Sequence, residues 1–195
     1  MSSVPKMAGK VCLITGANSG IGKVTAEALA SLGAQIIMVC RDRTRGEAAA
    51  ADVERAAEGA NIDLLIADLS SQTSIRELAA EVNKRYDHLD VLVNNAGALF
   101  TSLSVTVDGY ETTFATNHLA YFLLTHLLLD LLKKSAPSRI VNVSSRAHVS
   151  ATMRFDDLQS ERGYGASRVY GQSKLANVLF TNELARRLEG TGVTA

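Results

Sequence analysis

Apolar residues along this chain fall into two alternating patterns. Short apolar runs, such as 11–14 and 36–40, have the length of buried strands. Between them lie longer segments in which apolar residues recur every three or four positions, the period of an amphipathic helix. The runs predict strands over 10–15, 35–40, 62–67, 89–94 and 139–144. The periodic segments predict helices over 20–32, 44–57, 71–86 and 169–188, and a long helix within 107–134.

The alternation of strands and helices indicates the fold class. Strands that are apolar on both faces and separated by helices are typical of a parallel sheet covered on both sides. We therefore predict an α/β fold with a doubly wound, Rossmann-like parallel sheet of about five strands. The length fits one domain, so 1–195 is treated as a single unit. The very apolar segment 119–132 is too short to cross a bilayer and is expected to pack on the sheet or at a subunit interface.

Composition excludes several classes of protein. The 20 basic and 20 acidic residues balance, which gives no support to a nucleic-acid partner. Cys12 and Cys40 lie in strand-like runs and are expected to be buried thiols of a cytoplasmic protein. The four histidines show no metal-ligand spacing, so no metal site is predicted. No signal peptide or membrane-spanning segment is expected.

A glycine-rich turn follows the first predicted strand. Residues 11–22 read V-C-L-I-T-G-A-N-S-G-I-G, and a helix is predicted to begin within them. Gly16 allows a sharp turn, Gly20 lets an anion approach the backbone, and Gly22 permits close packing of helix on strand. Free N–H groups at the helix start would then face a pyrophosphate. The alternative is a purely structural turn.

Three further motifs follow along the chain. N-N-A-G occupies 94–97, a serine pair closes the fifth predicted strand at 144–145, and Y-x-x-x-K occupies 170–174. Together with T-G-x-x-x-G-x-G at 15–22, they make the whole chain resemble the short-chain dehydrogenase/reductase family. The retinol-dehydrogenase-like branch is resembled most closely in 15–23, 117–125, 142–145 and 173–193. The resemblance implies an NAD(P)-binding domain.

Tyr170 and Lys174 are one helical turn apart and therefore share a face of the last predicted helix. A phenol ordinarily titrates near pH 10 and is a poor proton shuttle at neutral pH, but a nearby ammonium favours the phenolate. The resemblance implies that Tyr170 is the acid–base catalyst and that Lys174 assists it and binds the coenzyme. The alternative is a solvated pair on the surface of an amphipathic helix.

The resemblance implies two further catalytic residues. Ser145 follows a buried strand and is expected to hold a substrate oxygen beside the Tyr170 hydroxyl. Ser144 is its rival, and a capping or turn role is the alternative for both serines. Asn117 is a poor helix former inside a predicted helix. The family uses this asparagine to bind a water that links the lysine to solvent, and bonding to local backbone is the alternative.

The coenzyme-binding residues implied by the resemblance come from several strand ends. Asn95 and its two successors are expected to pass under the adenosine ribose, whereas Asn94 is expected to tie neighbouring strands together. Asp68 is expected to bind the adenine amino group, with capping of the next turn as the alternative. The complete set is Gly16, Asn18, Ser19, Gly20, Ile21, Gly22, Arg41, Asp68, Asn95, Ala96, Gly97, Tyr170 and Lys174.

Arg41 ends the second predicted strand, where enzymes that prefer NAD usually carry an acid for the ribose 2′-hydroxyl. A guanidinium instead suits the 2′-phosphate of NADP in charge and in geometry. Lys23 or Arg43 is expected to assist, and Asp42 is expected to point away. NADP is therefore the predicted cofactor, and NAD is the less favoured one.

These residues predict an NADP(H)-dependent oxidoreductase that interconverts an alcohol and an aldehyde or ketone, with Tyr170 as acid and base. The branch that the chain resembles suggests a small lipophilic substrate. A non-catalytic dinucleotide-binding module or sensor is the alternative, and a homo-oligomer is compatible with both.

The chain departs from the family at 192–195. Family members begin a sixth strand here and continue into a substrate-binding lobe. We therefore expect an incomplete C-terminal portion, an open sheet edge at the fifth strand, and either a fragment or an impaired product. Membrane-anchored relatives also carry an N-terminal hydrophobic segment, so its absence indicates a soluble form.

Overall fold

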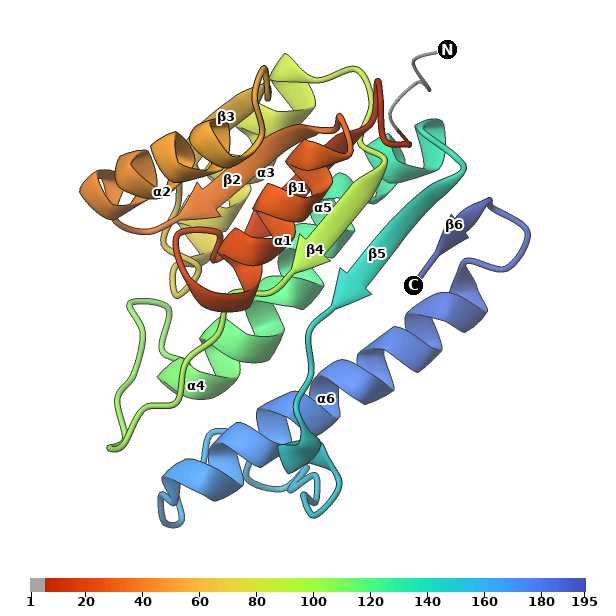
Figure 1. Cartoon of the computed structure of the whole chain (residues 1–195). Helices are drawn as coiled ribbons and strands as arrows, with labels where there is room; N and C mark the ends of the chain where they lie inside the picture. The colour runs from red at the N-terminus through yellow and green to blue at the C-terminus, as the bar shows by residue number, and fades with distance from the viewer. Residues whose placement is uncertain (1–5) are drawn as a thin grey trace.

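The computed structural model describes residues 6–195, so residues 1–5 of the predicted domain lie outside it. A parallel sheet with the strand order β3-β2-β1-β4-β5-β6 forms its centre (Figure 1). The order reverses between β1 and β4, which makes the sheet doubly wound and Rossmann-like, as predicted. The strands are β1 (Val11–Thr15), β2 (Gln35–Cys40), β3 (Ile62–Ile66), β4 (Val91–Asn94), β5 (Ser138–Asn142) and β6 (Val193–Thr194).

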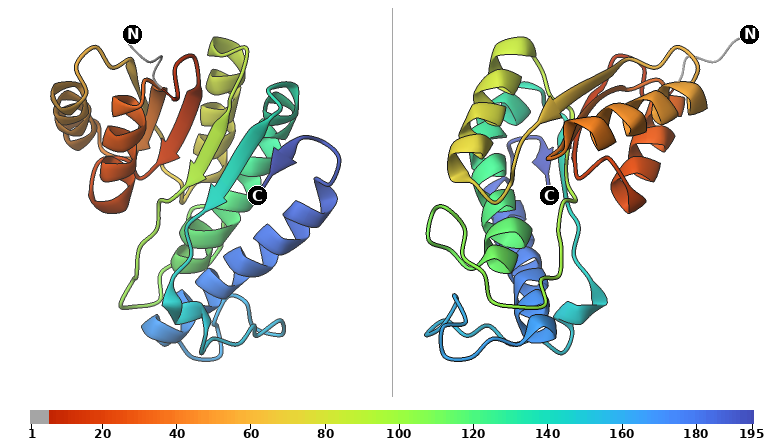
Figure 2. Two further views of the ribbon diagram at one scale, coloured as in Figure 1. Left: turned by 45° about the vertical axis from the view of Figure 1, so that its right-hand side comes forward. Right: turned by 90° about the vertical axis from the view of Figure 1, so that its left-hand side faces the viewer.

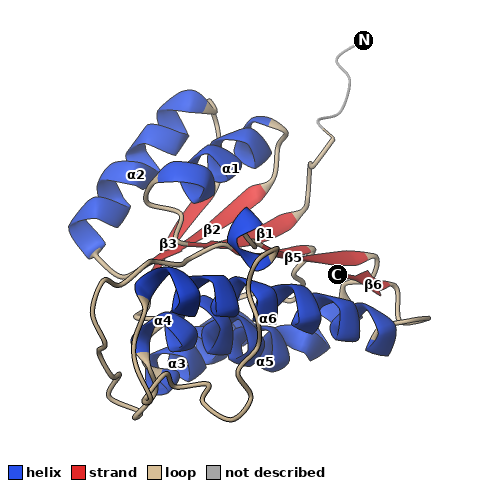
Figure 3. Cartoon of the chain, turned by 90° about the horizontal axis from the view of Figure 1, so that it is seen from below, coloured by secondary structure: helices blue, strands red, loops and turns tan. Residues whose placement is uncertain are grey.

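Helices cover the sheet from both sides. Figures 2 and 3 show α1 and α2 on one face and α3, α5 and α6 on the other. The short η1 is a π-helical turn and η2 is a 3₁₀ turn. The helices are α1 (Gly20–Ser31), α2 (Arg43–Ala56), α3 (Gln72–Arg85), α4 (Thr112–Phe114), η1 (Ala115–Leu119), α5 (Ala120–Lys134), η2 (Arg146–His148) and α6 (Ala166–Arg187).

Successive residues of the central strands enter two separate cores. Leu13 and Ile37 belong to the core shared with α3, α5 and α6, whereas Ile14 and Met38 belong to the core shared with α1 and α2. All four side chains are fully buried. Both faces of these strands therefore exclude water, which explains why the sequence shows continuous apolar runs there instead of alternation.

The sheet edge beside β5 differs from the prediction of about five strands. Val193 and Thr194 form a short sixth strand that pairs in parallel with Ser138 and Arg139. Two residues are too few to produce a hydrophobic pattern, so only the family resemblance, in which a sixth strand begins here, pointed to this strand. Further along β5, Ile140 lies in the core shared with α3, α5 and α6, whereas the next residue, Val141, is 39% exposed. Because β6 pairs with only the first two residues of β5, the predicted open edge is only partly covered.

The long helix predicted within 107–134 begins at Thr112. The Glu111 carboxylate accepts the backbone N–H groups of Thr113 (2.6 Å) and Phe114 (2.7 Å), so it caps the start of α4. Such a cap satisfies N–H groups that have no partner inside the helix. The chain then passes through η1 into α5. Residues before Glu111 form a loop, because Gly109 with φ +83° cannot continue a helix.

The start of α2 also corrects the sequence prediction. Thr44 and Glu47 form a capping-box pattern that places the helix start at Thr44. In the structure Asp42 is the N-cap, and its Oδ1 accepts the backbone N–H of Arg45 at 2.8 Å. The true cap lies two residues earlier, and its carboxylate is bound to the first turn of the helix.

The apolar segment within α5 packs on the sheet, as predicted. Leu124, Leu128 and Leu132 recur at four-residue intervals and are buried in the core beneath β1, β4 and β5. Across residues 6–195, no helix has the length and apolarity needed to cross a bilayer.

Candidate active site

A cleft of about 680 Å³ opens at the carboxyl ends of β1 and β4, where the strand order reverses. Ligands of doubly wound sheets bind at this position. Gly20 and Gly22 belong to the glycine-rich turn that forms one wall of the cleft. Asn117 accepts a hydrogen bond from Ala98, which lies in a second wall. The other predicted site residues all line the cleft: Gly16, Asn18, Ser19, Ile21, Arg41, Asp68, Asn95, Ala96, Gly97, Ser145, Tyr170 and Lys174.

The turn after β1 is shaped for an anion. Gly16 and Gly20 have φ of +67° and +53°, values that favour glycine. A Cβ on Gly20 would meet no atom within 4 Å, so the backbone there is open to approach. Ser19 precedes α1, and its side chain does not cap the helix. The N–H groups at the start of α1 therefore fit a dinucleotide pyrophosphate.

Gly22 is a tight contact between α1 and the strand ends. A Cβ here would lie 2.4 Å from the Gly16 carbonyl oxygen and 2.5 Å from Asn95 Nδ2. Asn95 donates from Nδ2 to the Thr15 carbonyl at 2.8 Å, and its backbone N–H donates to Thr15 Oγ1 at 2.9 Å. These bonds connect the end of β4 to the glycine turn and hold its shape.

Asn94 ties neighbouring strands together, as predicted. Its Nδ2 donates to Asn142 Oδ1 of β5 at 2.8 Å and to Thr125 Oγ1 of α5 at 2.9 Å. The side chain is fully buried. These bonds hold β4 and β5 together. The residues that follow β4 line the middle of the cleft, and Ser145, which follows β5, lines the part beside α6.

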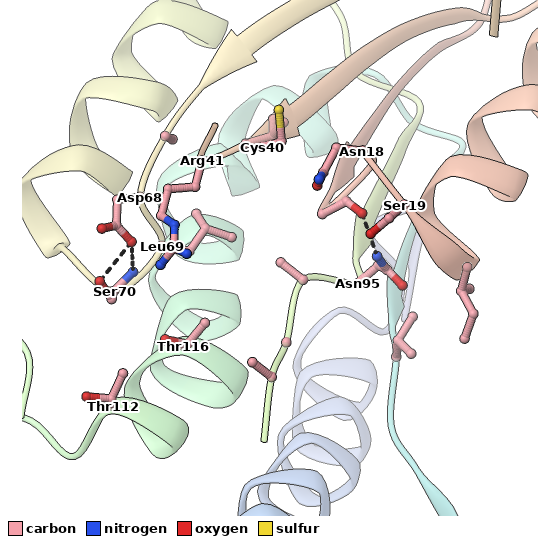
Figure 4. Close-up of a pocket in the computed structure, with 18 of the residues that line it drawn as sticks. Asn18, Ser19, Cys40, Arg41, Asp68, Leu69, Ser70, Asn95, Thr112 and Thr116 are labelled. Carbon is pink, nitrogen blue, oxygen red and sulfur yellow. Dashed lines mark hydrogen bonds between the residues drawn. The ribbon is translucent and has the colours of Figure 1, made fainter. Parts of the chain in front are cut away.

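The other end of the cleft is formed by the ends of β2 and β3. In Figure 4 the Arg41 side chain points toward the segment that holds Asp68 and Ser70. Asp68 Oδ1 accepts the backbone N–H of Ser70 at 2.9 Å and its hydroxyl at 2.8 Å. Asp68 therefore caps this turn, which was the alternative to binding adenine. An adenine contact stays a prediction.

Lys23 and Arg43, the expected helpers of Arg41, have other partners. Lys23 pairs with Asp52 of α2, and the Arg43 guanidinium lies 3.7 Å from the Glu47 carboxylate. Both cations are thus already balanced by acids outside the cleft.

Arg45 is a cleft residue that the sequence analysis missed. It lies in the first turn of α2 and lines the same end of the cleft as Arg41. Among residues 6–195, neither Arg41 nor Arg45 forms an ion pair, whereas the Asp42 carboxylate is bound as the helix cap. Recognising Asp42 as the cap would have placed Arg45 near Arg41. The two guanidiniums give this end of the cleft a positive charge suited to a phosphate.

Tyr170 and Lys174 share one face of α6, and Lys174 Nζ lies 5.7 Å from the centre of the Tyr170 ring. Lys174 is only 3% exposed, and its Nζ donates to the Val143 carbonyl at 3.1 Å. Burial lowers the pKa of Lys174 to about 8, because an ammonium loses hydration there. The pair is therefore not the solvated surface pair considered as the alternative.

Two adjacent serines at the end of β5 have different bonds. The Ser144 hydroxyl donates to the Lys174 carbonyl at 2.8 Å. Ser145 Oγ accepts the backbone N–H of Ala147 at 3.2 Å and so caps η2. Capping uses only the acceptor side of the Ser145 hydroxyl, which leaves its proton to donate into the cleft. The geometry favours Ser145 over Ser144 as the residue that holds a substrate oxygen.

Asn117 lies in the π-helical turn and is fully buried. Its Oδ1 accepts the backbone N–H of Ala98 at 2.8 Å, and its Nδ2 donates to the Ala98 carbonyl and to Ser173 Oγ. Its own carbonyl accepts Asn177 Nδ2 at 2.9 Å. The side chain thus connects the cleft wall to α6, and the predicted water-binding role stays a prediction.

A comparison with protein families matches residues 10–195 to the model described as short chain dehydrogenase. The chain belongs to this family. Retinol dehydrogenase 12 of Mus musculus is 50% identical over 187 residues, which are 96% of this chain and 59% of the relative. This short chain dehydrogenase family member thus spans about three fifths of that relative's length.

Solved structures of similar proteins have the same fold. An uncharacterized protein from Mycobacterium paratuberculosis is 41% identical, with a TM-score of 0.85 over 98% of this chain and 67% of that one. The Pseudomonas aeruginosa protein RhlG, in an active-site complex with NADP, is 31% identical, with a TM-score of 0.80 over 99% of this chain and 72% of that one.

Gly171 is a second residue near the cleft that the sequence did not point to. A Cβ on Gly171 would lie 3.0 Å from the Ala147 carbonyl oxygen and 3.2 Å from Ala151 Cβ. The glycine therefore lets η2, which follows Ser145, pack directly on α6 beside Tyr170. No local pattern marks such a glycine, because the contact joins segments on two different elements.

Replacing Asn117 with Ala in this family member is expected to lower the free energy of unfolding by about 2–4 kcal/mol. Three hydrogen bonds of the fully buried Asn117 amide are lost, two to the Ala98 backbone and one to the buried Ser173 hydroxyl. Urea unfolding measures the change. Asn83→Ala is the matched control, since its exposed amide makes one bond, to Leu127. Equal stability of the Asn117 variant and the original chain would contradict the structural role.

Proposed function

We propose that this protein is an NADP(H)-dependent oxidoreductase that interconverts a small lipophilic alcohol and the corresponding aldehyde or ketone. The observation that carries the proposal is the layout of one cleft. Tyr170, Lys174 and Ser145 line it together with the glycine turn and Arg41. An acid–base group is thus placed in the same space as a dinucleotide-binding turn.

Each end of the cleft has a separate task in this proposal. When bound, the nicotinamide coenzyme supplies or accepts a hydride. Tyr170 gives a proton to the substrate oxygen in reduction and removes it in oxidation. Ser145 donates a hydrogen bond to the same oxygen and so fixes its position. The buried Lys174 ammonium lies beside the Tyr170 ring and offers donors to a ribose hydroxyl.

The proposed substrate class follows from the relatives. Retinol dehydrogenase 12, which matches 96% of this chain, is named for retinol, a lipophilic alcohol. Incubating the protein with NADPH and a panel of aliphatic and aromatic aldehydes, and following coenzyme absorbance, tests this class. Reduction of polar aldehydes in preference to lipophilic ones would reject it.

A second candidate is a dinucleotide-binding module without turnover. The exposed Val141 of β5 favours it, because the sheet beside the cleft is open to water at this residue in the described chain. The same NADPH assay separates the two candidates. Saturable NADPH binding with no oxidation by any aldehyde would support the module, whereas oxidation would reject it.

We further propose that the protein works in the cytoplasm. Cys12 and Cys40 are free, buried thiols, and burial raises the pKa of both, that of Cys12 to about 12. Inert reduced cysteines of this kind are typical of a reducing compartment. Fractionation of cells that express the tagged chain tests the proposal, and recovery in the membrane fraction would reject it.

Coenzyme preference depends on the two arginines in this proposal. Arg41→Ala and Arg45→Ala are each expected to weaken NADP binding by about 10- to 100-fold, since each removes a charged hydrogen bond to the 2′-phosphate. NAD binding should hardly change, because NAD lacks that phosphate. Titration calorimetry with both coenzymes measures the effect.

Arg43→Ala is the control for these variants. Arg43 lies between the two arginines in sequence, but it pairs with Glu47. Its loss should leave both affinities unchanged. Equal losses of NADP and NAD affinity in the Arg41 or Arg45 variant would show that the arginine does not bind the 2′-phosphate.

A further inference from the structure

The ammonium of Lys174 is buried with few polar partners. Its Nζ donates to the Val143 carbonyl at 3.1 Å, and a Cβ on Gly97 would lie only 3.4 Å from it. No carboxylate of the described chain lies within ion-pair distance of it. A buried cation without an anion needs another source of electrostatic compensation.

An aromatic ring from the neighbouring helix supplies such compensation. Tyr121 of α5 is 1% exposed, and Lys174 Nζ lies over its ring at 5.7 Å from the centre. The ring of Tyr170 lies at the same distance from Nζ. A cation over an aromatic face within about 6 Å is attracted by the negative charge of that face. Lys174 is thus in contact range of two rings, one on its own helix and one on α5.

The hydroxyl of Tyr121 contributes no hydrogen bond within residues 6–195. It is buried and has no hydrogen-bond partner among the described residues. A buried hydroxyl without a partner is unfavourable, so the ring is the useful part of the side chain. The sequence analysis did not single out Tyr121, since it lies in a continuous apolar helix.

We propose that Tyr121 is a positioning residue for Lys174, whose ring face holds the ammonium between α5 and α6 and beside Tyr170. The inference rests on the proposed role of Lys174 in the cleft. In this arrangement Tyr121 does not touch the substrate and acts only through the lysine.

The protonation of Lys174 tests this arrangement. The groups that face its Nζ are the rings of Tyr121 and Tyr170, the Val143 carbonyl and the Gly97 backbone. Loss of the ring attraction would lower the pKa of Lys174 below its present value of about 8. If the ring only fills space, its removal admits water and raises that pKa instead. The two explanations therefore predict shifts of opposite sign.

The experiment is an NMR titration of the full chain without coenzyme, with ¹³C-labelled lysine and Lys174→Arg to assign the signal. Tyr121→Leu should lower the pKa of Lys174 by about one unit. Tyr121→Phe keeps the ring and should leave it within about 0.3 units. A rise or no change in Tyr121→Leu would overturn the proposal, and so would equal shifts in both variants.

A third variant guards against loss of folding in Tyr121→Leu. Pentafluorophenylalanine at position 121 keeps the size of the ring but removes the negative charge of its face. It should lower the pKa of Lys174 as Leu does, and an unchanged value would overturn the proposal. The titration needs no coenzyme, so a chain that fails to bind NADP would reject the proposed function without affecting this result.

Discussion

Replacing Tyr170 with Phe is expected to lower turnover by about 10²- to 10⁴-fold, the usual contribution of a positioned acid–base group. The variant loses only the hydroxyl that exchanges a proton with the substrate oxygen. NADP affinity should be nearly unchanged, because the glycine turn and the arginines lie on other elements. Initial rates of NADPH oxidation and titration calorimetry measure the two effects.

Tyr86→Phe is the matched control for this variant. Tyr86 follows α3, and its hydroxyl donates to Asp63 of β3, away from the cleft. The control should lose some stability and keep its turnover. Turnover within about threefold of the original in Tyr170→Phe would remove this tyrosine from the proposed reaction.

Replacing Gly22 with Ala is expected to abolish measurable NADP binding and to destabilise the fold by about 3 kcal/mol. The added Cβ would lie 2.4 Å from the Gly16 carbonyl oxygen and 2.5 Å from Asn95 Nδ2. Both atoms belong to the structure that shapes the phosphate turn, so relieving the clash opens the turn and separates α1 from β1. Calorimetric titration and urea unfolding measure these effects.

Gly59→Ala is the control for Gly22→Ala, because Gly59 lies in open space. Gly59 has φ +76°, and a Cβ there would meet no atom within 4 Å. Its replacement should destabilise the chain by about 1–2 kcal/mol through backbone strain alone and leave NADP affinity unchanged. Normal NADP binding by Gly22→Ala would show that close packing at this turn is not needed for the dinucleotide.

The fold class could be predicted because its signal is local. Residues 11–14 of β1 and 36–40 of β2 are all apolar, a pattern typical of strands whose two faces are both covered. The start of the long helix within 107–134 could not be predicted, since the Glu111 cap depends on how the preceding loop folds back. The sixth strand left no hydrophobic pattern because two residues carry no periodicity.

By itself, the sequence determined the parallel α/β sheet, the glycine turn and the i, i+4 relation of Tyr170 and Lys174, because spacing along one element dictates each of them. Only the tertiary structure decided that Gly171 lets η2 pack on α6 and that Tyr121 lies against Lys174. These contacts join elements far apart in the chain. Their geometry depends on how helices and strands pack, and no local pattern records that packing.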